Sequence, residues 1–205
     1  MTNYYGLKVN TKYNLNDYEE RIMTAAGDIV LFEAGIYKIY CDGDIFIKHN
    51  LVNNLIHVNC ISVRDDIQIN IECVGEVGVH GSEAAVSDVY HEVIVQNKNV
   101  LVNIKTKGVA ESDGKIIYRS KITNYSNNKE YGAGNGNQKA EFLKMSDQSE
   151  VDAEPSLDIL GDNFKCSHSF SVTHINEQKK SYLALHGYED KDIEKEIKES
   201  FLSML

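Results

Sequence analysis

The chain has 205 residues, 42% of them hydrophobic, and a formal net charge of −10. This length is enough for one sizeable core. No cluster of Lys and Arg interrupts the acidic background, and binding to phosphates needs clustered cations, so nucleic acid is not expected as a partner. Residues 1–10 lack the apolar stretch of a secretory signal, and no window approaches the roughly 18 apolar residues of a membrane span. We expect a cytoplasmic protein with no membrane partner.

The cysteines are spread along the chain without a C-x-x-C pair, which excludes a zinc knuckle and a thioredoxin-like motif. They are Cys41, Cys60, Cys73 and Cys166. The first three lie in or beside apolar stretches, and we interpret them as reduced core residues. The histidines in the first half of the chain are His49, His57, His80 and His91. They are scattered, and we expect no metal cluster from them.

In chain order, residues 1–28 form an N-terminal segment. Within it, Leu15–Thr24 fits a short helix, since Leu15, Tyr18 and Ile22 are spaced among charged residues. From residue 29 onward, apolar or β-branched residues recur at every second position, which is the period of a strand with one buried face. The expected strands are Ile29–Phe32, Ile36–Cys41, Ile45–His49, Leu55–Val63, Ile67–Cys73, Val89–Val95 and Val100–Lys105.

A second group of strands completes a predicted β core over residues 29–175. It comprises Lys115–Lys121, Ala140–Met145, Ser156–Leu160 and Phe164–Thr173. Polar turns such as Asp42–Asp44 separate the strands, and Asn124–Asn137 is rich in Asn and Gly, as in an exposed loop. The spacing fits a sandwich, a barrel or a β-helix. The turns mostly lack the Asn-Gly pairs of tight hairpins, and no long crossover is evident, which favours stacked coils.

Residues 176–205 are expected to form two short helices. Asn176 can cap a helix over Gln178–His186, and Gly187 can end it in a left-handed conformation. Asp190 or Asp192 then opens a last helix. Its apolar residues recur at every fourth position, at Ile193, Ile197, Phe201 and Leu205. This stripe can cover one end of the β core or bind a partner.

Six segments in the second half of the chain occur in an order that resembles the SufB/SufD family of iron–sulfur cluster assembly proteins. They are Gly114–Lys121, Lys139–Met145, Glu150–Ile159, Lys165–His168, Tyr182–Tyr188 and Ile197–Phe201. The resemblance spans about Gly114 to Phe201 and is strongest from Glu150 to His168. It implies a mainly β fold, a right-handed parallel β-helix followed by a short C-terminal helical hairpin.

The resemblance also implies that the hairpin docks the ATPase subunit SufC. The docking residues would be Tyr182, Leu183, Ile193, Ile197 and Phe201. Gly132–Gly136 lacks the Lys-Ser/Thr end of a phosphate loop, so nucleotide hydrolysis would belong to that partner. The chain itself is expected to be a non-enzymatic scaffold that forms a homodimer, or a heterodimer with a SufB-like protein.

Cys166 and His168 are the ligands that the resemblance suggests for iron or an iron–sulfur cluster, held transiently and shared with a partner chain. One residue apart on a strand, they point the same way, roughly 6 to 7 Å apart along the chain. Ser169 stands where SufB-like members carry glutamate, and Ala140 lies near the position of their earlier cysteine. The chain is therefore SufD-like at these positions.

Two other functions fit the sequence. A β-helix polysaccharide lyase or a cupin-like metalloenzyme would need clustered acids or histidines, and the sequence shows no such cluster. A degenerate subunit could keep the fold and dock the ATPase while binding no metal.

Overall fold

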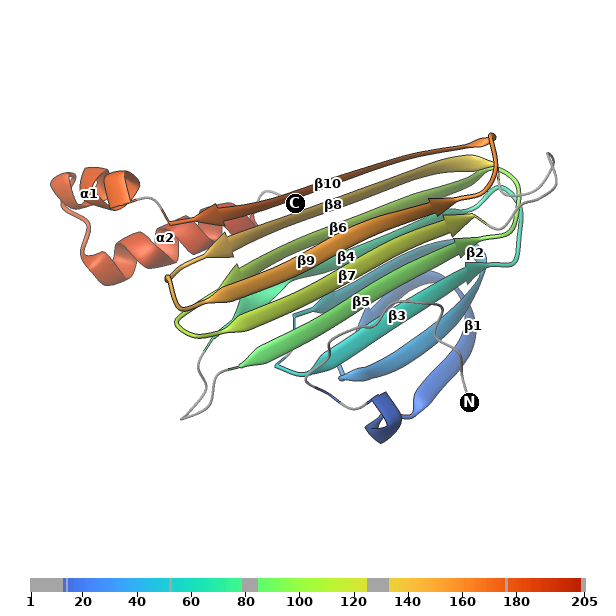
Figure 1. The fold of residues 1–205 in the computed structure, drawn as a ribbon, viewed down its shortest axis with the longest axis horizontal. Helices are drawn as coiled ribbons and strands as arrows, with labels where there is room; N and C mark the ends of the chain where they lie inside the picture. Colours follow the sequence, from blue (N-terminus) through green and yellow to red (C-terminus); the bar gives the residue numbers. More distant parts are fainter. Residues whose placement is uncertain are drawn as a thin grey trace.

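The computed structural model describes residues 13, 15–51, 53–78, 85–124, 133–175 and 177–203. A 3₁₀ turn at Leu15–Asp17 precedes the strands, and two helices follow them (Figure 1). The strands are β1 Glu20–Leu31, β2 Gly35–Asn50, β3 Leu55–Ser62, β4 Gln68–Val77, β5 Val86–Val95, β6 Val100–Ala110, β7 Lys115–Asn124, β8 Gly134–Lys144, β9 Glu150–Ile159 and β10 Phe164–His174. The helices are α1 Glu177–Leu185 and α2 Asp190–Leu202. The expectation of a mainly β chain with short C-terminal helices is confirmed.

Each strand from β2 to β8 pairs with the strand two positions further along the chain, and every pair in the described residues is parallel. The path through the sheet runs β10-β8-β6-β4-β2-β3-β5-β7-β9, and β1 pairs with β2. Even-numbered strands thus form one row and odd-numbered strands from β3 onward the other. The rows curve around a common interior, and β9 and β10, at the two ends of the path, come into contact.

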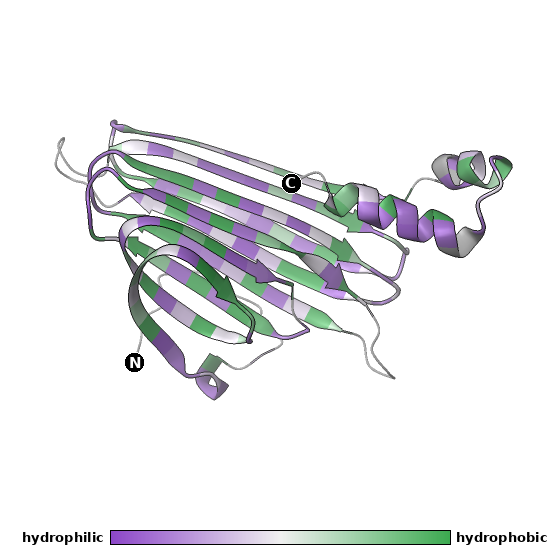
Figure 2. Ribbon diagram, turned by 180° about the vertical axis from the view of Figure 1, so that it is seen from behind, coloured by the Kyte–Doolittle hydropathy of each residue, from purple (hydrophilic) through white to green (hydrophobic). Residues whose placement is uncertain are grey.

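The interior is filled by alternate side chains from both rows, which produces the banding along the strands in Figure 2. Ile39, Ile71 and Ile104 are among its fully buried members. Cys41, Cys60 and Cys73 are also fully buried, so their placement in the core is confirmed. Glycines make room for large residues in this interior. A methyl group at Gly108 would lie 2.9 Å from the ring of Phe142.

The helix that fitted Leu15–Thr24 is wrong, because β1 begins at Glu20 and pairs with β2. Met23, Ala25 and Ile29 pack against the core from this strand. The hydrogen bonds to β2 and the burial of these three side chains stabilise a strand more than the spacing of apolar residues stabilises a helix. At Gly27, where φ is +83°, the register of β1 shifts, so that β1 follows the bend of β2.

The turn expected at Asp42–Asp44 lies inside a single strand, β2. Residues 35–41 of β2 pair with β3 and residues 45–50 pair with β4, so β2 passes from one row to the other at this point. The loop expected over Asn124–Asn137 is partly wrong, since Gly134–Asn137 belongs to β8. Residues 125–132 of that loop lie outside the described residues.

The two C-terminal helices are confirmed, and Gly187 ends the first with φ at +89°. Helix α2 contacts both α1 and β6, and Ile193 on it is 1% exposed. Asn176 and Leu205 lie outside the described residues. No helix in the described part of the chain is both long and apolar enough to cross a membrane.

Candidate functional site

Cys166 and His168 lie on β10, the last strand of the even row. Cys166 pairs with Gly136 and is half-buried, while His168 is exposed. A methyl group at Gly136 would lie 2.7 Å from the Cys166 Sγ and 3.0 Å from a ring carbon of Phe164, so the thiol faces the interior side of the sheet. Burial raises the pKa of the Cys166 thiol to about 11, although a backbone hydrogen bond at Ser167 opposes the shift. By the alternation of the strand, His168 shares this face.

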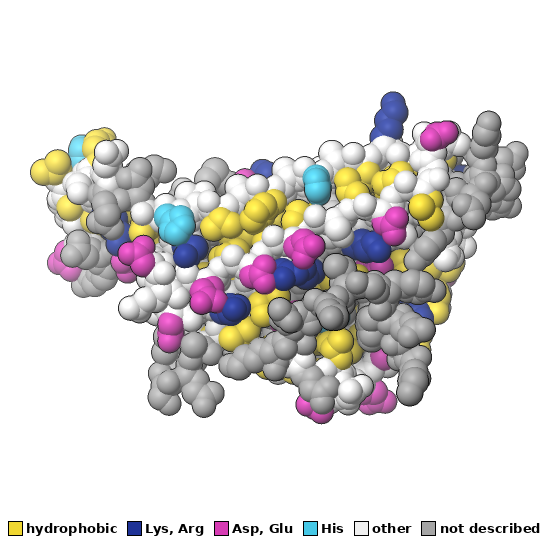
Figure 3. Space-filling view, in the orientation of Figure 1, with side chains coloured by type: hydrophobic (Ala, Val, Ile, Leu, Met, Phe, Trp, Pro, Cys, Tyr) yellow, Lys and Arg dark blue, Asp and Glu magenta, His cyan; other side chains and the backbone are white. Residues whose placement is uncertain are grey.

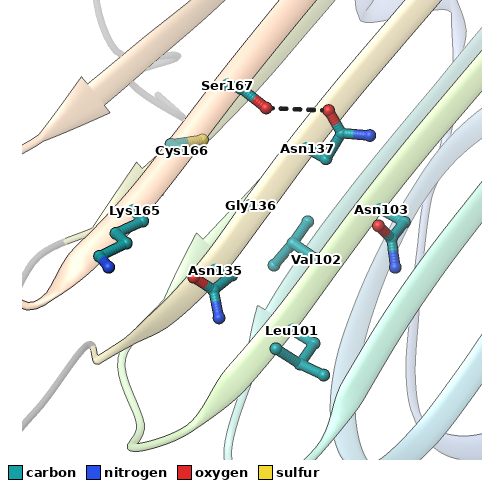
Figure 4. Close-up of a pocket in the computed structure, with 9 residues that line it drawn as sticks. All are labelled: Leu101, Val102, Asn103, Asn135, Gly136, Asn137, Lys165, Cys166 and Ser167. Carbon is teal, nitrogen blue, oxygen red and sulfur yellow. Dashed lines mark hydrogen bonds between the residues drawn. The ribbon is translucent and has the colours of Figure 1, made fainter.

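The opposite face of the same strands carries a shallow pocket of about 370 Å³ (Figure 4). Its outward side chains come from three neighbouring strands: Leu101 and Asn103, Asn135 and Asn137, and Lys165 and Ser167. The Ser167 hydroxyl donates to the Asn137 side-chain oxygen at 3.0 Å. Val102, Gly136 and Cys166, which alternate with these residues, complete the lining of the pocket.

The last coil is open at its end, since β9 and β10 each have a ladder partner on one side among the described strands. Phe170 is 47% exposed on the same face as Cys166 and His168. Leu160, just after β9, is also largely exposed. Unpaired strand edges beside exposed apolar side chains are typical of surfaces that pair with another chain.

The helices extend beyond the end of the sheet, and exposed apolar side chains gather on them (Figure 3). Of the expected docking residues, Tyr182 is 60% exposed and Leu183 is half-buried. Leu185, which the sequence analysis did not select, is 86% exposed, and Tyr188 is 46% exposed. The exposed apolar surface of the hairpin therefore lies on and just after α1.

The other expected docking residues lie on α2, which is held against the sheet. Ile193 is buried, and Ile197 and Phe201 are half-buried. Lys107 donates to the backbone oxygen of Phe201 at 2.9 Å and lies 5.1 Å from the centre of its ring. Lys198 forms ion pairs with Glu76 and Glu111 from the sheet. Helix α2 is thus attached to the sheet through Phe201 and Lys198, and its apolar residues are less exposed than those of α1.

A group of side chains that the sequence analysis did not select lies inside the coil. The ligand atoms of His49, Cys73 and His91 lie within 4.8 Å of one another, and all three residues are buried. The Nε2 atoms of the two histidines are 2.7 Å apart. The expectation that these histidines are scattered is wrong, because the sheet register brings together residues far apart in the sequence. His80 lies outside the described residues.

Burial sets the protonation of this group. It lowers the pKa of His49 to about 4, against a hydrogen bond to the backbone of Asn50. Burial also lowers the pKa of His91 well below its usual range, and coulombic interactions with His49 and His57 act in the same direction. Burial raises the pKa of Cys73 above its usual range. Both imidazoles are therefore neutral at physiological pH, the form that binds metals.

A comparison with protein families matches residues 67–201 to the core domain of the SufBD proteins, described as SUF system FeS cluster assembly. The chain belongs to the SufBD family. The match runs from the start of β4 through the open last coil and both C-terminal helices. It includes Cys166, His168 and the exposed surface of α1.

One curated SufBD relative is described as an iron–sulfur cluster assembly SufBD family protein of Staphylococcus epidermidis. It is 25% identical over 111 residues, which are 54% of this chain and 23% of that protein. The chain thus matches about a quarter of the length of that relative.

In this SufBD chain the expected ligands share one strand face at the open end of the coil. Within the described residues, His49, Cys73 and His91 form the one group of at least three potential ligands, and Cys166 and His168 are not part of it. A complete metal site at Cys166 and His168 would need ligands from another chain. A thiolate and an imidazole are suitable ligands for iron.

Proposed function

We propose that this chain is a SufD-like, non-enzymatic scaffold subunit of cytoplasmic iron–sulfur cluster assembly. The observation that carries the proposal is the placement of Cys166 and His168 at the open end of the coil, within a chain of the SufBD family. The strand order, with strands pairing two positions along the chain, supports the assignment of a parallel β-helix, and the family resemblance implies its right-handed form.

The proposed cargo is iron or an iron–sulfur cluster, held transiently by Cys166 and His168. Two ligands on one strand do not complete a coordination sphere, so the remaining ligands would come from a second chain at the open edges of β9 and β10. That chain would be a second copy or a SufB-like protein. The exposed Phe170 beside these ligands would be covered in the same contact.

The proposed ATPase partner would dock on the surface formed by Tyr182, Leu185 and Tyr188, and not on the covered stripe of α2. These side chains are exposed on α1 and just after it, and Figures 1 and 3 show this helix, with hydrophobic side chains at its surface, at one end of the molecule. Ile193, Ile197 and Phe201 would then act indirectly, because α2 contacts β6, where Lys107 binds Phe201, and this contact positions the hairpin.

Co-purification with a SufC-like ATPase tests the docking surface. Leu185→Glu places a charge in that surface and should reduce the ATPase captured by at least about tenfold, the effect of losing one buried apolar contact. Phe32→Glu is the matched control, because Phe32 is 81% exposed but lies at the end of β1. Equal capture by the Leu185 variant and the unmodified chain would contradict docking on α1.

Iron content after co-expression with the partner proteins tests the cargo site. Cys166→Ala and His168→Ala should each lower the iron bound by the assembled complex without changing its subunit composition. Unchanged iron in both variants would favour the second candidate, a subunit that keeps the fold and the docking surface but binds no metal. The missing thiol near Ala140 is the observation that favours that candidate.

A further inference from the structure

We propose that His49, Cys73 and His91 form an internal binding site for one divalent transition-metal ion of borderline softness, such as Zn²⁺. The site lies inside the coil, on strands other than that of Cys166 and His168, and the inference does not depend on the proposed function. Two imidazoles and a thiolate are a common ligand set for such ions.

The sheet register builds the ligand set. His49 on β2 pairs directly with Cys73 on β4, so their side chains point into the interior from neighbouring strands of one row. His91 on β5 points inward from the facing row. The cluster therefore crosses the interior, and an ion bound there would connect the two rows.

The distances suit one ion after a small movement of the side chains. With metal–nitrogen bonds of about 2.0 Å and a metal–sulfur bond of about 2.3 Å, tetrahedral ligand atoms lie roughly 3.3 to 3.6 Å apart. The ligand atoms here lie within 4.8 Å of one another, and the two Nε2 atoms are 2.7 Å apart. The imidazoles need to separate by less than about 1 Å to admit the ion.

The backbone fixes His49 in the tautomer that binds a metal. Its Nδ1 lies 3.2 Å from the carbonyl oxygen of Asn50, and a carbonyl accepts hydrogen bonds, so Nδ1 carries the proton. The lone pair of His49 Nε2 therefore points at His91 and into the cluster. An imidazole whose second nitrogen donates to a backbone carbonyl is the usual arrangement around a protein-bound metal.

The unpaired nitrogen of His91 is the second indication. His91 is 0% exposed, and its Nδ1 lacks a hydrogen-bond partner within the described part of the chain. An imidazole placed there for packing alone would cost free energy, because its polar atom is desolvated without compensation. A metal bond at Nε2 would offset this cost for the imidazole as a whole, with the ring proton held on Nδ1.

Three protein ligands leave a fourth position for a water molecule or an anion. Tyr118 is the buried polar residue beside the cluster, with its ring centre 5.6 Å from that of His91. The ligands are 0 to 3% exposed, so the ion would enter as the chain folds and exchange slowly afterwards.

Cobalt substitution tests the site. The full chain is produced in zinc-depleted medium containing Co²⁺, and metal content and visible and near-ultraviolet spectra are measured on the purified protein. We expect one Co²⁺ per chain, with the ligand-field bands of tetrahedral cobalt and a thiolate-to-cobalt charge-transfer band. Cys73→Ser should abolish the charge-transfer band, and His49→Gln should lower the cobalt content by at least about tenfold.

Two control variants exclude other thiols. Cys60→Ser changes another fully buried thiol outside the cluster, and Cys166→Ser removes the half-buried thiol. Both should keep the cobalt spectrum of the unmodified chain. Circular dichroism establishes that each variant is folded, and His49→Gln provides a second measurement if Cys73→Ser does not fold. A folded, unmodified chain without cobalt would overturn the proposal, as would a spectrum lost in Cys166→Ser but kept in Cys73→Ser.

Discussion

Gly108 and Phe142 are directly paired between β6 and β8, and the absence of a side chain at Gly108 makes room for the Phe142 ring. Phe142 is 0% exposed and packs against Tyr118, with ring centres 5.4 Å apart. Phe142→Ala should lower the free energy of unfolding by about 3–5 kcal/mol, because it leaves a cavity in the interior. Gly108→Ala should cost about 1–3 kcal/mol through overpacking, since the methyl group would lie 2.9 Å from Phe142 and 2.9 Å from Leu51.

The double variant should be more stable than the two separate losses predict, because the methyl group at Gly108 fills part of the cavity left at Phe142. We expect a favourable coupling of about 1–2 kcal/mol, measured as a double-mutant cycle by urea unfolding with unchanged m-values. Phe32→Ala, at an 81% exposed position, is the control and should change stability by less than about 0.5 kcal/mol. Losses at Gly108 and Phe142 that add to within about 0.5 kcal/mol would refute the packing described here.

Two further predictions concern single side chains. In the metal-free protein, Cys166 should react with iodoacetamide about tenfold faster for each unit of pH up to about 11, since the thiolate is the reactive form and burial raises the pKa of its thiol to about 11. A rate measured by mass spectrometry that levels off below pH 9 would contradict the environment assigned to Cys166. Arg119→Met should cost about 1–3 kcal/mol in urea unfolding, because Arg119 donates to the backbone oxygen of Asp152 at 2.8 Å and to its carboxylate at 2.7 Å. Asp152→Asn keeps the backbone acceptor and should cost less, so a larger loss for Asp152→Asn would show that the carboxylate dominates this contact.

The sequence predicts a strand well where the apolar residues at every second position are also the residues buried in the fold. Leu55–Val63 was found close to the limits of β3, because its inward residues Ile56, Val58 and Cys60 belong to the core. The C-terminal helices were found because Gly187 and the four-residue spacing on α2 are local signals. Such signals depend only on residues close together in the sequence, so they do not change with the pairing of distant strands.

Features set by pairing between distant strands were not predictable in the same way. The strand at Glu20 depends on its ladder to Ile36, which local propensity does not encode. The cluster of His49, Cys73 and His91 likewise depends on the register of β2 with β4 and on the row opposite. No spacing in the sequence identifies those three residues as neighbours. Cys166 and His168 were identifiable because they belong to one strand and to a recognisable motif.

The pairing of each strand with the strand two positions along has a consequence for how the chain tolerates insertions and deletions. Ile69 pairs with Val102, and Val102 with Gly136, so one complete coil separates each strand from its ladder partner. Removing one whole coil would bring two strands of the same row into contact, with their inward faces still aligned. Removing a few residues within a strand would instead turn inward side chains outward. Length changes in this part of the molecule should therefore be accepted in steps of a full coil or within the turns, and rejected within the strands.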